Sequence, residues 1–279
     1  AGVDARMQVA PRAIGVFLGF NCTFHPFMGY PSYKTIADLP LDQRVKRMRD
    51  PAFKAKILSE KTEKLARPGS SVPPLADMLM EHIDYVAEKF FQLGNPPDYE
   101  QAAESSLAAK ARAKGVSLME MIYDTLLERD GHELIYLPLY NYTELNYDNV
   151  LKMMQHPQAL YGLSDGGAHV GTVCDASMPT FMLTHWTRDR TRGDKLSLPR
   201  VVRMLTGAQA DYMGMADRGY VREGLKADLN IIDLDNLQME PPHMVPDLPA
   251  GGQRLWPGAP CPRCPYEPAR GLNESTLVG

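Results

Sequence analysis

The sequence of 279 residues lacks the features that mark several large classes of protein. It has no apolar run of roughly eighteen residues, the length that a membrane helix needs, so we expect no membrane span. Its 30 basic residues do not outnumber its 34 acidic ones, and no basic stripe indicates a nucleic-acid partner. Four cysteines are too few for a disulfide-dense secreted scaffold, which favours a reducing, cytoplasmic setting.

What remains is the composition of an ordinary globular protein. Hydrophobic residues make up 44% of the chain and charged residues 23%, which excludes a disordered or collagen-like chain. Segments with strand-like and helical patterns alternate to about residue 215, and a β segment follows. This order is typical of an α/β protein with a C-terminal β appendage.

The element boundaries follow from capping residues and turn signals. Asp50 before Pro51 is a typical helix start, and Ser117 with Glu120 forms a capping box. Residues 224–233 read as a turn that leads into a strand. The other expected strands are 13–20, 133–140 and 159–165, and the expected helices are 41–49, 51–66, 98–114, 117–131, 149–156, 178–190 and 198–214.

The two ends of the chain depart from this pattern. An apolar strand follows Ala1 within about a dozen residues and no signal sequence precedes it, so we expect an N-terminal part to be missing. The segment 256–279 holds too many prolines for a strand and is expected to be an irregular tail. Cys261 and Cys264 in this tail form at most half a zinc site, because a second pair is lacking.

Asp165 is the best candidate for a catalytic group. It ends a short apolar strand and is followed by Gly166 and Gly167, and barrel enzymes place catalytic carboxylates at such strand ends. The alternative is a tight turn with a local Asx cap. His169 either touches substrate or bonds to backbone, and His25 either reaches a barrel mouth or is a structural loop residue.

Residues 162–171, with the sequence GLSDGGAHVG, resemble the eighth-strand motif of the amidohydrolase superfamily. The resemblance is to the branch that contains the D-aminoacylases and other N-acyl-D-amino-acid deacylases, and it covers about residues 7–255. Other matching segments occur in the family's order: 12–27, 39–44, 49–51, 205–229 and 247–254.

This resemblance implies the C-terminal part of a metal-dependent (β/α)8 TIM barrel, comprising strands seven and eight with their helices, plus part of a small β-sandwich. The expected division is 1–218 for the barrel portion, 219–255 for the β domain and 256–279 for the tail. The family's HxH metal-ligand pair is absent from this sequence. Zinc is the implied cofactor, and the resemblance makes Asp165 the proton shuttle, in contact with the metal through bound water. Gly166, Gly167, His169 and His25 are the expected substrate contacts.

The resemblance therefore implies a hydrolase of non-peptide C–N bonds that acts on a small N-acyl amino acid or related amide. Because the main metal ligands are missing, we expect the 279-residue chain to be inactive, and unpaired strand edges favour self-association. A cyclic amidase, a lactonase and a non-catalytic remnant or interaction module stay open as alternatives. Arg188 and Arg190 either bind a substrate carboxylate or form ion pairs on a helix face. The arginine that short D-aminoacylases place after the aspartate has no counterpart in residues 175–180.

Overall fold

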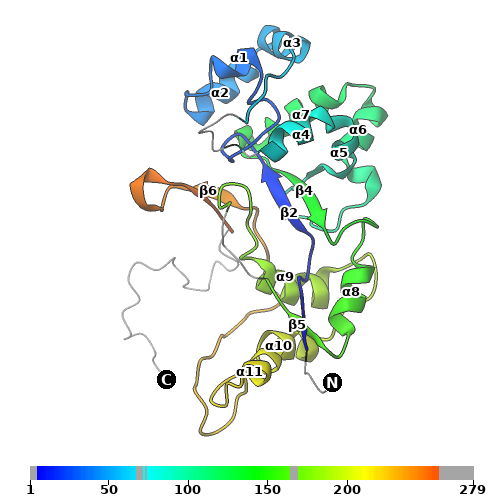
Figure 1. Ribbon diagram of the computed structural model, residues 1–279, viewed down its shortest axis with the longest axis vertical. Coiled ribbons are helices and arrows are strands. Elements are labelled where there is room, and N and C mark those ends of the chain that lie inside the picture. The colour runs from blue at the N-terminus through cyan, green and yellow to red at the C-terminus, as the bar shows by residue number, and fades with distance from the viewer. Residues whose placement is uncertain (1–4, 67–71, 73, 164–168, 258–279) are drawn as a thin grey trace.

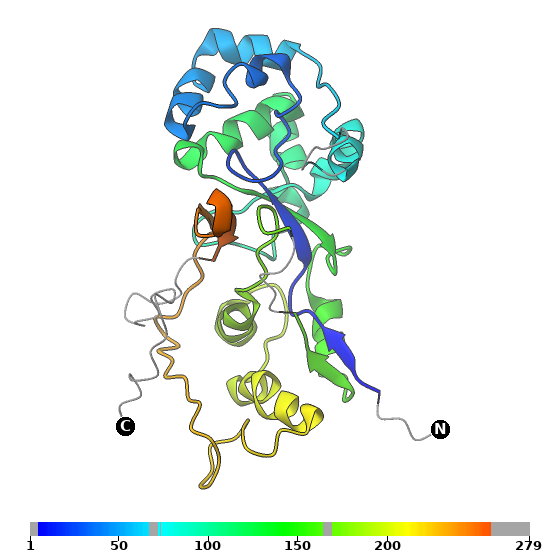
Figure 2. The ribbon, with the colours of Figure 1, turned by 60° about the vertical axis from the view of Figure 1, so that its left-hand side comes forward.

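The computed structural model describes residues 5–66, 72, 74–163 and 169–257. Asp165, Gly166, Gly167, Cys261 and Cys264 therefore lie outside the described residues. Figures 1 and 2 show helices α1 to α7 gathered at one end of the molecule and α8 to α11 at the other, with strands β2 and β4 running between them.

The described residues form three small sheets. The strands are β1 Met7–Val9, β2 Ile14–Leu18, β3 Phe91–Gln92, β4 Ile135–Tyr140, β5 Ala159–Tyr161, β6 His243–Val245 and β7 Arg254–Trp256. β4 lies between β2 and β3 and is antiparallel to both, and β6 is antiparallel to β7. β1 and β5 pair in parallel. Within the described residues, the parallel pairing expected of adjacent barrel strands is found between β1 and β5 only, and no closed barrel forms.

The helices begin at several of the expected caps. The helices are α1 Pro31–Lys34, α2 Leu41–Met48, α3 Pro51–Ser59, α4 Pro74–Glu81, α5 Ile83–Val86, α6 Leu107–Lys114, α7 Leu118–Leu126, α8 Asp148–Gln155, α9 Met178–Thr184, α10 Leu198–Leu205 and α11 Gly207–Met213. The Asp50 carboxylate accepts hydrogen bonds from the first turn of α3, and the Ser117 hydroxyl accepts one from the Glu120 amide. The cap at Asp50 is confirmed. At Ser117 the hydroxyl caps the helix, but the Glu120 carboxylate forms an ion pair of 3.0 Å with Nζ of Lys54, so only the serine half of the predicted capping box is confirmed.

Several expected boundaries are wrong. The helix expected over 51–66 ends at Ser59, and the one expected over 98–114 begins only after Ser106, which caps it. Asp98 instead accepts a hydrogen bond from the Glu100 amide within a turn. The helix expected over 198–214 is interrupted at Thr206, where the backbone is not helical. The strand expected within 224–233 does not form: an extended segment needs a partner for its backbone hydrogen bonds, and the described strands pair with one another and not with this segment.

Two apolar clusters form the core of the described part of the chain. One packs α1 to α7 against the end of β2 around residues such as Phe27, Phe90 and Tyr123. The other packs α8 to α10 against β1, β4 and β5 around Tyr147, Phe181 and Trp186. Tyr161 and Cys174, which lie on the two sides of Asp165 in the sequence, both pack in the second cluster. None of the helices described here has the length and apolar character that crossing a membrane requires.

Candidate active site

We call residues 162–172, of which 162–163 and 169–172 are described, the Asp165 loop. It follows the end of β5, beside the parallel strand β1. The amide of Gly162 donates a hydrogen bond of 3.0 Å to the carbonyl of Val9, which extends the pairing by one residue. A Cβ on Gly162 would lie 2.7 Å from the Cβ of Gln8, so only glycine fits this close approach. Leu163 then turns away with a φ of 72°. The entry to the loop is thus fixed by backbone contacts at the carboxyl end of a parallel pair.

The far side of the loop is bonded to the end of β2. The amide of Phe17 donates to the carbonyl of Thr172 at 2.7 Å, and the Thr172 hydroxyl donates back to the Phe17 carbonyl at 2.9 Å. The Thr23 amide donates to the carbonyl of Gly171 at 2.9 Å. His169, with a φ of 60°, accepts the Thr172 amide at its own carbonyl and exposes its side chain. Its backbone thus shapes the turn, while its imidazole remains accessible from solvent.

Arg12 fixes the segment that follows. This side chain is 1% exposed and donates from Nη1 to the Ser177 hydroxyl at 3.0 Å and from Nη2 to the Cys174 carbonyl at 2.9 Å. Its Nη2 also lies 3.4 Å from Oδ1 of Asp175, and its guanidinium packs 4.0 Å from the ring centre of Tyr99. A buried arginine three residues after β1 therefore anchors the return of the Asp165 loop. No motif marked Arg12 for this role, because its partners are more than 160 residues away in sequence.

His25 lies in the core and not at an open mouth. It is 2% exposed, and its ring contacts those of Phe20 and Tyr33 edge-on. Its Nδ1 accepts the amide of Phe27 at 3.3 Å. Burial, reinforced by the positive charge of Arg44, lowers the pKa of His25 to about 3. This placement favours the reading of His25 as a structural loop residue.

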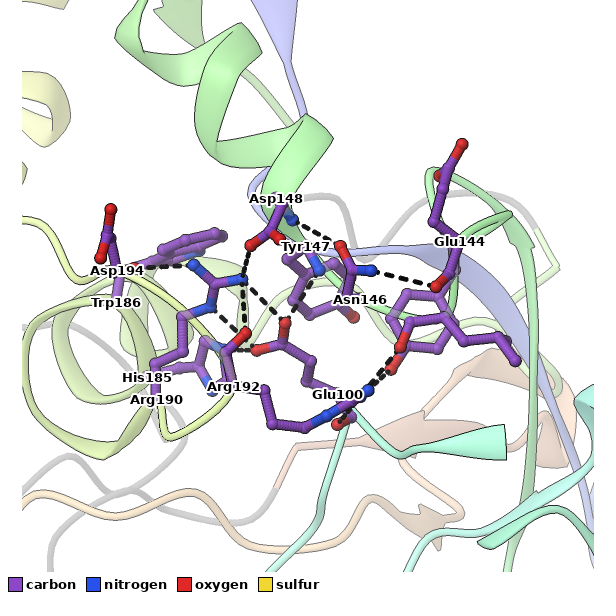
Figure 3. Close-up of polar contacts among 12 residues, drawn as sticks. Glu100, Glu144, Asn146, Tyr147, Asp148, His185, Trp186, Arg190, Arg192 and Asp194 are labelled. Atoms are coloured by element: carbon purple, nitrogen blue, oxygen red, sulfur yellow. Dashed lines mark hydrogen bonds and ion pairs between the residues drawn. The ribbon is translucent and has the colours of Figure 1, made fainter. Parts of the chain in front are cut away.

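A second polar cluster surrounds the buried carboxylate of Glu100 and is drawn in Figure 3. Arg190 donates to both oxygens of Glu100, from Nη2 at 3.0 Å and from Nε at 3.1 Å. His185 Nε2 lies 2.8 Å from Oε2, and the amide of Tyr147 donates to Oε1 at 2.8 Å. Burial by itself would raise the pKa of Glu100, but the hydrogen bonds from His185, Arg190 and Tyr147 outweigh it and lower the pKa to about 2. The carboxylate is therefore ionised at neutral pH.

The contacts of the two arginines after α9 decide between their two readings. Arg190 is 1% exposed and is shared between Glu100 and Asp148, which accepts from its Nη2 at 2.8 Å. Arg188 pairs with Asp189 and donates to backbone carbonyls of residues 234–237. Both side chains form ion pairs within the protein, as the second reading expected, although Arg190 is buried and not on a solvated face.

The described residues do not supply a metal centre. Among them, no group of three or more His, Cys, Asp or Glu side chains is placed to hold an ion, whereas protein zinc sites use three or four such ligands. Cys22 and Cys174 are free and buried, and burial raises the pKa of their thiols to about 12 and about 11. Neither thiol is activated as a nucleophile. The described part of the chain therefore does not fit zinc.

Comparison with known proteins adds one finding. A family model described as an amidohydrolase family matches residues 6–251, and so includes both sides of the Asp165 loop. No curated protein and no solved structure matches the chain.

Proposed function

Because the chain belongs to the amidohydrolase family, we propose that it serves the hydrolysis of a non-peptide C–N bond, in a small N-acyl amino acid or related amide. The observation that carries this proposal is the parallel pair of β1 and β5, after which the chain enters the Asp165 loop. Barrel enzymes place their catalytic groups at the carboxyl ends of parallel strands. The D-aminoacylase type is the finer part of the proposal and rests on the sequence resemblance.

Asp165 would act as the proton shuttle of this reaction. The oxygen of a water molecule bonds to the acyl carbon, and the Asp165 carboxylate takes the proton that the water loses. When the C–N bond breaks, the same carboxyl group delivers that proton to the departing nitrogen, so the products are an acid and an amine. A positioned acid–base group of this kind contributes about 10²–10⁴-fold to a rate.

The anchors of the loop support this role. The backbone contact of Gly162, the bonds between Thr172 and Phe17, and the buried Arg12 fix both sides of the loop. Precise placement matters because a misplacement of about 1 Å costs roughly a hundredfold in rate. Amidohydrolases generally depend on a metal, which activates the attacking water. The described residues offer no ligand set for such a metal.

The test compares Asp165→Asn with the exposed control Asp84→Asn. Both variants are made in the 279-residue chain and in a hybrid that joins it to the upstream half of a full-length family member. Substrates are N-acetyl-D-methionine, a cyclic amide and a lactone. We expect turnover of N-acetyl-D-methionine in the hybrid and a fall of at least about 100-fold for Asp165→Asn, with unchanged zinc content and melting temperature. Near-normal turnover by Asp165→Asn would leave the Asx turn as the function of this residue.

A further inference from the structure

A groove of about 650 Å³ lies outside the Asp165 loop. Three segments line it: the turn at Asn95 and Pro96, the turn before β4 with Arg129 and His132, and residues 238–243, which lead into β6. Its volume falls within the range of roughly 300–1,000 Å³ that small-molecule sites occupy. The sequence patterns gave no indication of this groove, because its walls come from three distant parts of the chain.

Arg129 supplies the guanidinium of the groove. Its backbone is left-handed, with a φ of 51°, and its side chain is 37% exposed. Its Nη1 forms an ion pair with Oε1 of the buried Glu133 at 4.0 Å, a separation longer than the roughly 2.7–2.9 Å of a charge-assisted hydrogen bond. No residue of the described chain accepts a hydrogen bond from this guanidinium. Its planar set of donors can therefore bind a ligand carboxylate in the groove.

The remaining polar groups of the groove narrow the class of ligand. The imidazoles of His132 and His243 can donate hydrogen bonds to an anion, whereas the carboxylate of Glu240 only accepts them. A plain anion would be repelled by Glu240. A molecule that carries both a carboxylate and an N–H donor has a partner for each in the groove: Arg129 for the carboxylate and Glu240 for the N–H.

The groove is connected to the Asp165 loop through the sheet of β6 and β7. His243 at the groove pairs with Trp256, and the next pair is Met244 with Leu255. The amide of Leu255 donates to the carbonyl of Val170 at 2.7 Å. One wall of the groove is thus bonded to the chain five residues after Asp165.

We propose that this groove binds small carboxylic acids that also carry an N–H donor, with Arg129 holding the carboxylate and Glu240 accepting the N–H. The site would recognise one end of a ligand and performs no chemistry of its own. The choice of an N-acyl amino acid as its probe rests on the proposed function, but binding can be measured without turnover.

The experiment measures binding of N-acetyl-D-methionine and of its neutral carboxamide to the 279-residue chain by ligand-observed NMR. We expect the acid to bind in the range of about 1 mM and the carboxamide at least about tenfold more weakly. Arg129→Gln should weaken acid binding about tenfold and leave the carboxamide unchanged, and Arg129→Lys should retain part of the affinity. Arg222→Gln, at an exposed arginine outside the groove, is the matched control.

Equal binding of acid and carboxamide, no binding of the acid at about 10 mM, or an unchanged affinity in Arg129→Gln would each overturn the proposal. Glu240→Gln tests the second contact and should weaken binding of the acid. Tighter binding of the acid by Glu240→Gln would show that Glu240 only repels the ligand carboxylate, and would contradict its role as acceptor. Hydrolysis by the hybrid is assayed in parallel. Selective binding without hydrolysis would contradict the proposed function alone, and hydrolysis with unselective binding would contradict the groove alone.

Discussion

Replacing Glu100 by Gln tests the buried network around Arg190. The change keeps the size of the side chain and one acceptor oxygen, but it removes the negative charge. It also replaces one of the two carboxylate oxygens, to which Arg190, His185 and Tyr147 are bonded, by an NH2 group that cannot accept a hydrogen bond. Within the described part of the chain, Arg190 then keeps Asp148 as its one charged partner, and the Asp148 side chain is 58% exposed. The buried guanidinium is then poorly compensated, which destabilises the folded state.

The expected loss of stability in Glu100→Gln can be worked out in two ways. Lowering the pKa of Glu100 from 4.5 to about 2 corresponds to about 3 kcal/mol of stability at neutral pH. Removing one partner of a buried ion pair costs about 3–5 kcal/mol, and the oxygen that Gln retains offsets part of this. We therefore expect Glu100→Gln to lower the free energy of unfolding by about 2–4 kcal/mol in urea titrations near pH 7. Glu104→Gln, at an exposed glutamate, should change it by less than about 0.5 kcal/mol.

The pH dependence provides a second check. Because the pKa of Glu100 is lower in the folded state, its contribution is complete well above pH 4.5 and is lost as the pH falls towards 2. The difference in stability between the wild-type chain and Glu100→Gln should shrink by about 1 kcal/mol between pH 4.5 and pH 3.5. A difference below about 0.5 kcal/mol at neutral pH, or one that does not change with pH, would refute the reasoning.

Three further predictions follow from other contacts. Arg12→Met should lower the free energy of unfolding by about 3–5 kcal/mol. It should also raise the amide hydrogen-exchange rates of residues 169–177 more than those of the other residues, and an equal rise throughout the chain would contradict the anchoring role of Arg12. The pKa of His25 is about 6.5 in the unfolded chain and about 3 in the folded state, so the unfolded chain binds the proton first as the pH falls. The free energy of unfolding should therefore fall by about 1 kcal/mol from pH 7 to 5.5. An equal fall in His25→Gln would show that other groups cause it. We also expect self-association through the exposed apolar side chains of Leu229, Ile231 and Ile232, of which Ile231 is 93% exposed. Ile231→Lys should weaken this self-association in sedimentation velocity, and a wild-type chain that stays monomeric at all concentrations would contradict it.

The sequence determined those features that depend on near neighbours. The caps at Asp50 and Ser117 involve residues two or three positions away, and a pattern can specify such contacts directly. The strands β2, β4 and β5 were expected for the same reason, from short apolar runs. The family was also readable, because the motif around Asp165 and the segments beside it keep their order along the chain.

Only the tertiary structure decided which distant groups meet. Arg12 finds Cys174 and Ser177, Glu100 finds Arg190, and Arg129 lies across from residues 238–243. These contacts are set by the packing of whole elements, and neither spacing nor periodicity encodes them. The burial of His25 is of the same kind: a histidine beside a proline has the same sequence signature whether it faces solvent or core. Its surroundings, Phe20, Tyr33 and Arg44, come together only when the loop after β2 folds against α1 and α2.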